Sequence, residues 1–220
     1  MKLKICDFLK RRKDAIDVSD RVKYKRAKIR INHKGISVRD ELDGSQIKTK
    51  RQFLIQKGQF LLSKIDARNG AFGIVPEELD NGIITGNFWT FNVDESMVLK
   101  DFFKAFTETI SFVDICLRAS SGTTNRKYLD EKKFLDIDIE VPDLSIQKIA
   151  VKIYHERKFT IDGLVENGIG QRVKLSNLRQ AILQEAVQGK LTAKWREENP
   201  SVEHASELLK RIEAEKQQLI

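Results

Sequence analysis

Residues 59–80 read QFLLSKIDARNGAFGIVPEELD, and this stretch sets the class of the fold. Two short apolar runs, residues 59–63 and 71–75, flank a polar turn, and Pro76 follows the second run. Short apolar runs bounded by glycine and proline are typical of β-strands. The sequence therefore predicts two strands joined by a turn, and charged or polar side chains at Lys64, Arg68 and Asn69 should project from that turn.

The pattern continues on both sides of this strand pair. Further strands are predicted at residues 53–55, 82–85, 86–93 and 136–141, and residues 24–31 have nearly the two-residue period of a strand, with a phase slip around Ala27. Residues 101–119 instead carry apolar side chains at helical spacing, which predicts one buried amphipathic helix. We therefore expect an α+β fold with a strand-rich, mixed domain over residues 1–143.

A different pattern follows Pro142. Residues 144–189 contain no proline, and apolar residues recur three and four positions apart, which predicts a long helix that presents an apolar stripe to a partner helix. We call this stripe the helix seam. It consists of Ile146, Ile149, Ile153, Ile161, Leu164, Leu175, Leu178 and Ile182.

Three glycines leave the continuity of this helix open. Gly163, Gly168 and Gly170 each cost about 1 kcal/mol relative to alanine in a helix interior. Gly189 is suited to end the helix. Residues 190–220 are expected to form a polar linker up to Pro200 and a terminal helix over about residues 202–218, which would connect toward a second half.

The positive charge is concentrated in the N-terminal third. Residues 1–70 hold 20 Lys and Arg against 8 Asp and Glu, a balance of +12, and the other 150 residues hold 20 against 24, or −4, which together give the net charge of +8. A concentrated basic surface is the electrostatic signature of a polyanion ligand such as nucleic acid. A basic surface that is merely solvated is the alternative.

Several classes of protein are disfavoured by the sequence. No apolar run approaches the length of a membrane span, and the two cysteines fit a reduced, cytoplasmic protein without a disulfide framework. The three histidines lack metal-ligand spacing, and neither a phosphate-binding glycine loop nor an Asn/Asp-Pro-Pro-aromatic methyltransferase loop is present. We therefore expect a binding protein that is not an enzyme and needs no cofactor or metal.

Three regions of the sequence resemble one known family. Residues 59–80, together with ITGNFW at residues 84–89, resemble the target-recognition domain of the specificity subunits of type I restriction-modification systems. Residues 119–135, ASSGTTNRKYLDEKKFL, are similar to a later loop and helix start of that domain. LRQAILQEAVQGKLT at residues 178–192 and ASELLKRI at residues 205–212 resemble the conserved helical region that follows it.

This resemblance implies a non-catalytic subunit that reads double-stranded DNA. In that family two recognition domains each read half of a split target, and two helical regions pair as an antiparallel coiled coil that sets the spacing between the domains. The subunit docks two modification subunits, which the restriction subunits join. Because one recognition domain and one helical region are seen here, the chain is expected to be either an N-terminal fragment of a full subunit, which we favour, or a half-subunit that acts as a homodimer.

Candidate DNA contacts follow from residue type and position. Arginine and asparagine pair with the edges of guanine and adenine, and lysine contacts phosphates. Because targets differ among family members, residues 24–51, outside the shared stretches, are the better place for base specificity. The predicted contacts are Lys48, Lys50, Arg51, Lys64, Arg68, Asn69, Asn87, Thr123, Thr124, Asn125, Arg126 and Lys127.

Other interpretations stay open at this point. The polar groups of the turn and of the loop at residues 120–127 could instead stabilise the domain's own loops and have no ligand. The same basic face could also serve a protein that binds nucleic acid without regard to sequence, or one that binds an acidic partner. A fused nuclease or methyltransferase is the enzyme alternative, and the missing cofactor loops argue against it.

Overall fold

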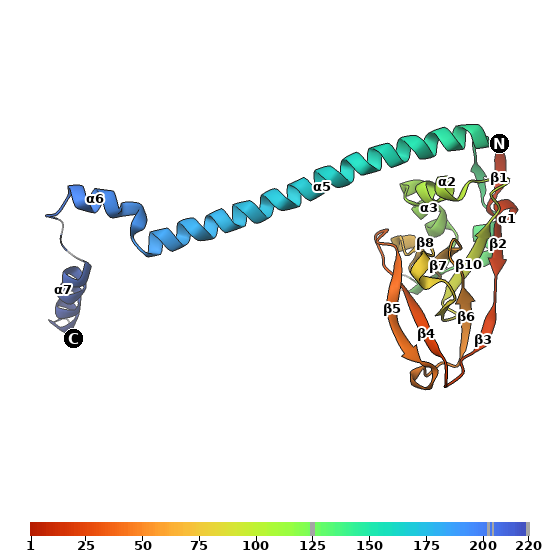
Figure 1. The fold of residues 1–220 in the computed structure, drawn as a ribbon, viewed down its shortest axis with the longest axis horizontal. Coiled ribbons are helices and arrows are strands. Elements are labelled where there is room, and N and C mark those ends of the chain that lie inside the picture. The colour runs from red at the N-terminus through yellow and green to blue at the C-terminus, as the bar shows by residue number, and fades with distance from the viewer. Residues whose placement is uncertain (124–125, 202, 204, 219–220) are drawn as a thin grey trace. The chain divides into compact units, whose positions relative to one another are not determined.

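The computed structural model describes residues 1–123, 126–201, 203 and 205–218. The chain forms two compact units, Met1–Arg157 and Lys158–Ile220, and each is described by itself. Strands dominate the first unit and helices make up the second (Figure 1). The predicted α+β class is confirmed.

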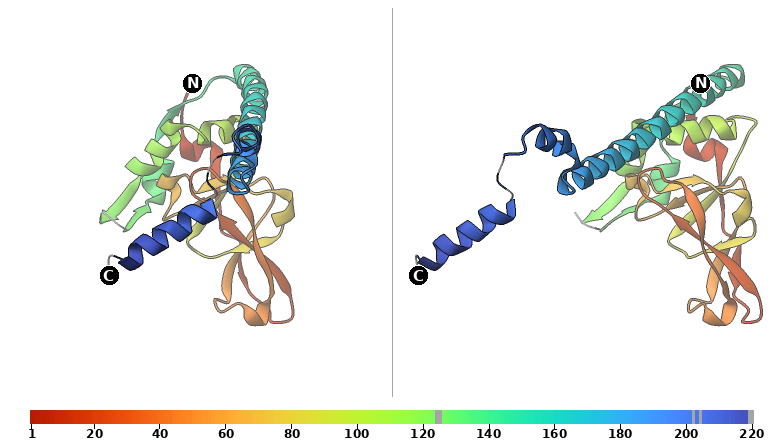
Figure 2. Two further views of the ribbon diagram at one scale, coloured as in Figure 1. Left: turned by 90° about the vertical axis from the view of Figure 1, so that its left-hand side faces the viewer. Right: turned by 60° about the vertical axis from the view of Figure 1, so that its left-hand side comes forward.

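A five-stranded sheet forms one end of the first unit, and α2 and α3 lie at the other end (Figure 2). Its strands all pair antiparallel except β4 and β9, which run parallel. In order across the sheet they are β3 (Ala15–Asp17), β6 (Arg51–Ile55), β9 (Gly82–Ile84), β4 (Lys23–Ile29) and β5 (Ile36–Asp43).

A four-stranded antiparallel sheet contains the strand pair with which the sequence analysis began. Its order is β2 (Leu9–Arg12), β10 (Phe88–Val93), β7 (Phe60–Ser63) and β8 (Phe72–Ile74). The turn between β7 and β8 contains the short 3-10 helix η2 (Ala67–Asn69). Gly70 ends η2 at a φ of 75°, a left-handed conformation that glycine adopts without steric cost.

The one helix predicted over residues 101–119 is two helices, so that expectation was wrong. α2 (Lys100–Thr107) and α3 (Ile110–Arg118) are separated at Glu108 and Thr109. The Thr109 hydroxyl accepts a hydrogen bond from the Phe112 backbone N–H at 3.4 Å and caps α3. The break leaves Ile110, which was expected to be buried, 81% exposed.

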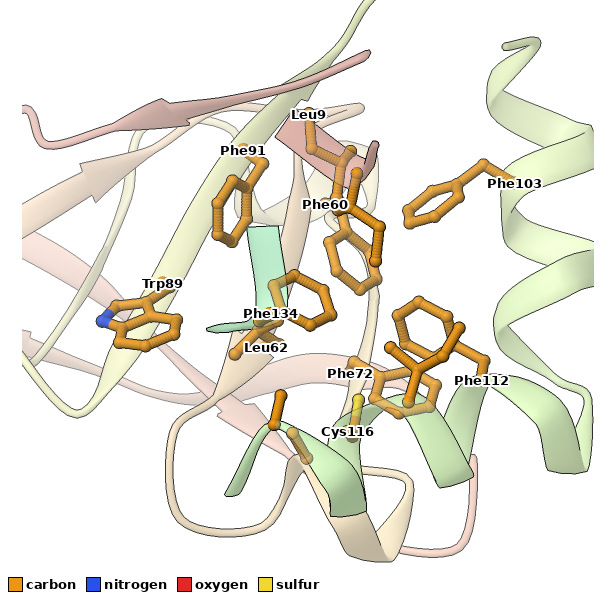
Figure 3. Packing of buried hydrophobic residues seen from close by; sticks show 14 of the residues in the cluster. Leu9, Phe60, Leu62, Phe72, Trp89, Phe91, Phe103, Phe112, Cys116 and Phe134 are labelled. Carbon is orange, nitrogen blue, oxygen red and sulfur yellow. The ribbon is translucent and has the colours of Figure 1, made fainter. Parts of the chain in front are cut away.

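Phenylalanine rings make the core between the four-stranded sheet and the helices (Figure 3). Phe112 of α3 is fully buried, and its ring centroid lies 4.9 Å from that of Phe72 and 5.8 Å from that of Phe103, both edge-to-face. Edge-to-face pairs place the positive ring edge on a negative ring face and add to the hydrophobic gain. This core fixes the helices on the sheet.

The remaining elements of the first unit are short. The sequence analysis did not identify β1, β2, β3 or β5, because the charged residues in these strands obscure the two-residue apolar alternation. The further elements are β1 (Lys2–Lys4), α1 (Ile5–Phe8), η1 (Gly44–Gln46), η3 (Glu77–Leu79), β11 (Ser120–Thr123), β12 (Arg126–Leu129), α4 (Glu131–Leu135) and β13 (Asp138–Glu140).

The predicted long helix is α5 (Leu144–Val187), a single helix of 44 residues and about 66 Å at 1.5 Å per residue. It runs without interruption through Gly163, Gly168 and Gly170, where an added Cβ would meet nothing within 4 Å. Gly189 follows at a φ of 69° and its N–H bonds the carbonyl of Ala186, as expected of a residue that ends a helix.

Buried polar contacts hold the first turns of α5 against the rest of the first unit. The Gln147 amide is fully buried; its oxygen accepts from the Leu99 N–H at 2.8 Å, and its nitrogen donates to the carbonyls of Met97 and Pro142. The Asp143 carboxylate accepts hydrogen bonds from the first turn, and those from Ser145 and Ile146 hold its pKa below the ordinary value.

Beyond α5 the chain is more helical than expected. The segment predicted as a polar linker contains η4 (Lys190–Thr192) and α6 (Ala193–Glu198), which corrects that prediction. The terminal helix is α7 (Ala205–Gln218). Among the described helices, none is both long enough and apolar enough to cross a membrane.

Candidate nucleic-acid interface

A groove lies over the five-stranded sheet, with a volume of about 420 Å³. Four cationic side chains line it: Arg26 and Lys28 of β4, Arg39 of β5, and Lys48 in the loop that leads to β6. Its other lining residues are Ala27, Ile29, Leu42, Gln46, Ile47, Thr49, Gln52, Ile83, Ile84, Thr85 and Phe88. We call this feature the basic groove.

Arg26 is already neutralised within the protein. It faces Asp40 across β4 and β5, and its Nε and one terminal nitrogen each donate to a different carboxylate oxygen at 2.7 Å. This bidentate hydrogen bonding lowers the pKa of Asp40 and raises that of Arg26. The pair is therefore a fixed part of the groove.

Arg39 owes its position to a β-bulge. The β4–β5 register shifts between Arg26 and Ala27, where the phase slip was predicted, and Arg39 is the residue of β5 without a counterpart in β4. Its side chain is 61% exposed, and its Nε lies 3.5 Å from the nearer Asp40 oxygen, a loose ion pair. Bulges re-aim side chains in this way.

Of the four cations that line the basic groove, the sequence analysis named Lys48 alone as a DNA contact. Arg26, Lys28 and Arg39 fall within residues 24–51, the segment expected to hold base specificity, but none was named. The signal for Lys28 was the alternation of basic and apolar residues in β4. The position of Arg39 depends on pairing with a neighbouring strand, which no local pattern reveals.

The three candidates at residues 48–51 have different surroundings. Lys48 is exposed at the basic groove. Lys50 is also exposed, but its Nζ is paired within the domain: it donates to the Asp20 carboxylate at 2.5 Å and to the Gly44 carbonyl at 2.7 Å. Arg51 begins β6 and is exposed. Of the three, Lys50 is the least available to a ligand.

A second group of candidates meets at the four-stranded sheet. The Lys64 N–H donates to the Asn87 carbonyl at 2.9 Å, and the Lys64 carbonyl accepts from Leu129 at 2.8 Å, which joins both residues to the end of the β11–β12 hairpin. The Lys64 ammonium lies 5.9 Å from the Trp89 ring centroid, a cation–π contact. Asn87 is exposed.

Arg68 and Asn69 lie in η2, on the turn predicted to project them. Arg68 is half-buried and Asn69 is exposed. The Asn69 side-chain amide donates to the Asp66 carboxylate at 3.2 Å, and the backbone carbonyl of Asn69 accepts from the Asn32 N–H at 2.8 Å. These bonds favour the alternative in which Asn69 braces the domain's own loops.

The last candidates belong to the β11–β12 hairpin. Thr123 ends β11 and Arg126 begins β12, and the two are paired in its register. Lys127 faces Gly122 and is half-buried. Thr124 and Asn125 lie outside the described residues. Lys127 thus lies on β12, the strand whose last residue, Leu129, is hydrogen-bonded to Lys64.

Every residue of the helix seam is exposed. In the first unit Ile146, Ile149 and Ile153 are 45–60% exposed. In the second unit the exposed fractions of Ile161, Leu164, Leu175, Leu178 and Ile182 run from 48% to 67%. The prediction omitted other exposed apolar side chains of α5, namely Phe159, Val165, Ile169, Val173, Leu183 and Val187. Apolar exposure on this scale marks an interaction surface.

The described residues contain no group of three or more His, Cys, Asp or Glu side chains able to hold a metal ion. Cys6 and Cys116 are free, and burial raises the pKa of the Cys116 thiol to about 12. A thiol with so high a pKa is unreactive near neutral pH.

The fold is a strand-rich α+β domain followed by a long helix, and solved structures share this fold. A chain from a structure on complex assembly and conformational transition of the type I R-M system matches with a TM-score of 0.61 and 13% identity, over 93% of this chain and 51% of that chain. The HsdS subunit from Thermoanaerobacter tengcongensis matches with a TM-score of 0.54 and 15% identity, over the same shares.

Sequence comparison gives related proteins of the same kind. The chain is 33% identical to the type I restriction enzyme EcoDI specificity subunit of Escherichia coli over 113 residues, which are 49% of this chain and 25% of that protein. It is 31% identical to the EcoBI specificity subunit over 101 residues, 44% of this chain and 21% of that protein. No family model matches.

Fold and sequence together relate this chain to the specificity subunits of type I restriction enzymes, and the predicted resemblance is confirmed. The chain spans about a quarter of the length of the curated relatives and about half of the length of the solved chains that it matches.

Proposed function

We infer that this chain is the non-catalytic, sequence-reading part of a type I restriction-modification complex and reads one half of a bipartite DNA target. The observation that carries this proposal is the basic groove on a fold shared with specificity subunits. Positive charge concentrated in residues 1–70 supports a duplex ligand, because each neutralised phosphate releases bound counterions.

The division of labour along the chain follows the sequence boundaries. Residues 1–143 form the target-recognition domain, residues 144–189 the spacer helix and residues 190–220 the linker and terminal helix that lead toward a second half. Lys64, Asn87 and the β11–β12 hairpin form a second DNA contact, with Lys127 at a phosphate.

The exposed helix seam serves protein partners. An apolar stripe with spacings of three and four residues fits against another helix, and here that helix belongs to a second copy of the chain or to the second half of a full subunit. Modification subunits dock on this assembly, and restriction subunits join through them. The methyl transfer and cleavage then belong to those partners and not to this chain.

Comparison of genomic methylation in the source strain tests the function. Deleting the gene that encodes this chain should abolish methylation at one bipartite motif, and restoring the gene should restore it. Methylation that is unchanged by the deletion would contradict the proposal.

A sequence-blind nucleic-acid-binding protein is the competing function, since a basic groove also binds phosphates without reading bases. Binding assays with purified modification subunits present separate the two. Equal, salt-sensitive affinity for every duplex would favour a protein that binds without regard to sequence. Tighter binding to duplexes that contain the motif found by methylation mapping would support sequence recognition.

A further inference from the structure

We propose that the basic groove is where this chain reads its duplex, with Arg39 contacting a base edge while Lys28 and Lys48 contact phosphates. This inference rests on the proposed function and adds to it the residues that do the reading. Lys48 was already a predicted DNA contact within residues 24–51, whereas Arg39 and Lys28 were not candidates.

The charge of the groove comes from three of its four cations. Asp40 neutralises Arg26 through two hydrogen bonds, so that pair adds no net charge. The side chains of Lys28 and Lys48 have no hydrogen-bond or ion-pair partner within the described part of the chain, and Arg39 touches Asp40 only at 3.5 Å. An excess positive charge of about three on one groove favours a polyanion over a neutral ligand.

The placement of the cations separates their roles. Lys28 comes from β4, Arg39 from β5 and Lys48 from the loop before β6, so positive charge is spread over three segments around one groove. An ammonium group is a point charge that suits a phosphate, whereas a guanidinium is a planar fork that pairs with two acceptors of guanine. Arg39 is the guanidinium with its fork available.

The bulge and Asp40 hold Arg39 ready for this contact. The bulge removes Arg39 from the regular ladder, and 61% of its side chain is exposed. Because its Nε is 3.5 Å from the carboxylate, the guanidinium is attracted there without a full hydrogen bond that binding would have to break. Arg26 keeps the carboxylate in place from the opposite strand.

The test uses the complete gene that encodes this chain together with its partner subunits, and four kinds of variant. Arg39→Ala removes the proposed reading group, and Arg39→Lys keeps its charge but removes the fork. Lys28→Ala and Lys48→Ala each remove one proposed phosphate contact. Lys133→Ala is the matched control, since Lys133 is an exposed lysine on α4 outside the groove. Thermal melting of each variant checks that it folds.

Arg39→Ala and Arg39→Lys should both reduce base specificity at one position of the motif. The preference for the original base pair there should fall about 10- to 100-fold. Lys28→Ala and Lys48→Ala should keep the motif and weaken binding of all duplexes alike. Each should reduce the slope of log affinity against log salt concentration by about one. Lys133→Ala should leave motif and slope unchanged.

Two failures can be told apart. If deletion of the gene does not alter methylation, the proposed function itself is wrong. If the gene is required for the motif but folded Arg39→Ala and Arg39→Lys proteins keep the motif unchanged, the assignment of base reading to Arg39 is overturned while the function stands. Unaltered salt slopes in both lysine variants would likewise remove Lys28 and Lys48 from the interface.

Discussion

Arg26 of β4 and Asp40 of β5 lie opposite each other, and the guanidinium donates to both carboxylate oxygens at 2.7 Å. The pair lies directly beside the β-bulge at Arg39. The pair joins two strands of the sheet over which the basic groove lies. Its ionic interaction should therefore help to stabilise the groove.

The stability of this pair should depend on pH in a defined direction. Arg26 lowers the pKa of Asp40 from its ordinary value of 3.8, so the stabilisation is present above pH 3.8 and is lost as the pH falls through the lower folded-state pKa. We expect Asp40→Asn to cost about 1 kcal/mol at pH 7, because the pair is only partly exposed, and less at pH 2. Urea unfolding at both pH values measures this.

Glu77→Gln provides the comparison for Asp40→Asn. Glu77 pairs with Lys57, but its side chain is 78% exposed, so solvent should screen the pair and Glu77→Gln should change stability less than Asp40→Asn does. A cost for Asp40→Asn that is the same at pH 2 and pH 7 would contradict the ion-pair explanation.

Phe112 should be among the most costly residues to truncate. It is fully buried and contacts the rings of Phe60, Phe72 and Phe103. Phe112→Ala should destabilise the first unit by about 3–5 kcal/mol, through lost burial and the cavity that remains. Ile110→Ala, two residues earlier but 81% exposed, should change stability by about 0.5 kcal/mol or less. Comparable losses for both in denaturant unfolding would refute this core.

Charge on the helix seam should prevent self-association. Leu175 and Leu178 are 65% and 57% exposed, and glutamate at both positions would place two charges where a partner helix has to bury apolar surface. Leu175→Glu/Leu178→Glu should therefore sediment as a monomer under conditions where the unaltered chain is dimeric. The control Asn177→Glu/Gln184→Glu introduces the same charge change at two exposed polar positions of α5 outside the helix seam and should stay dimeric. An unchanged sedimentation coefficient for the leucine variant would remove the seam from the interface.

The glycines of α5 should limit the stability of the helix. An added Cβ at Gly168 or Gly170 meets nothing within 4 Å, so alanine there is expected to stabilise the helix by about 1 kcal/mol per site. Circular dichroism during thermal unfolding should show greater helicity and a higher midpoint for Gly168→Ala/Gly170→Ala. A lower midpoint would mean that one of these glycines is needed for a contact with a partner.

Cys116 should be inert in the folded chain. Burial raises the pKa of its thiol from 9.0 to about 12, which lowers the thiolate fraction at pH 8 by roughly a thousandfold. In native alkylation at pH 8, followed by peptide mass spectrometry, Cys6 should be modified first because it is only half-buried. Cys116 should react after denaturation, and rapid native labelling of Cys116 would show that the core opens locally.

Local patterns in the sequence determined the features that depend on residues near one another. The apolar runs around residues 59–80 predicted β7 and β8, and the proline-free stretch after Pro142 predicted α5. Both predictions were possible because the periodicity of a strand or a helix can be recognised within a short segment of sequence. The break at Thr109 was missed because apolar residues on both sides keep helical spacing across it.

Tertiary structure alone decided where the basic groove lies. Lys28, Arg39 and Lys48 are separated by about ten residues each along the chain, and they meet at one groove because β4 and β5 pair with a register shift and η1 returns the chain to β6. The engagement of Lys50 by Asp20 is equally non-local. Strand pairing and ion pairing join residues that are distant in sequence, so composition established that the N-terminal third is basic, while the fold decided which cations are left for a ligand.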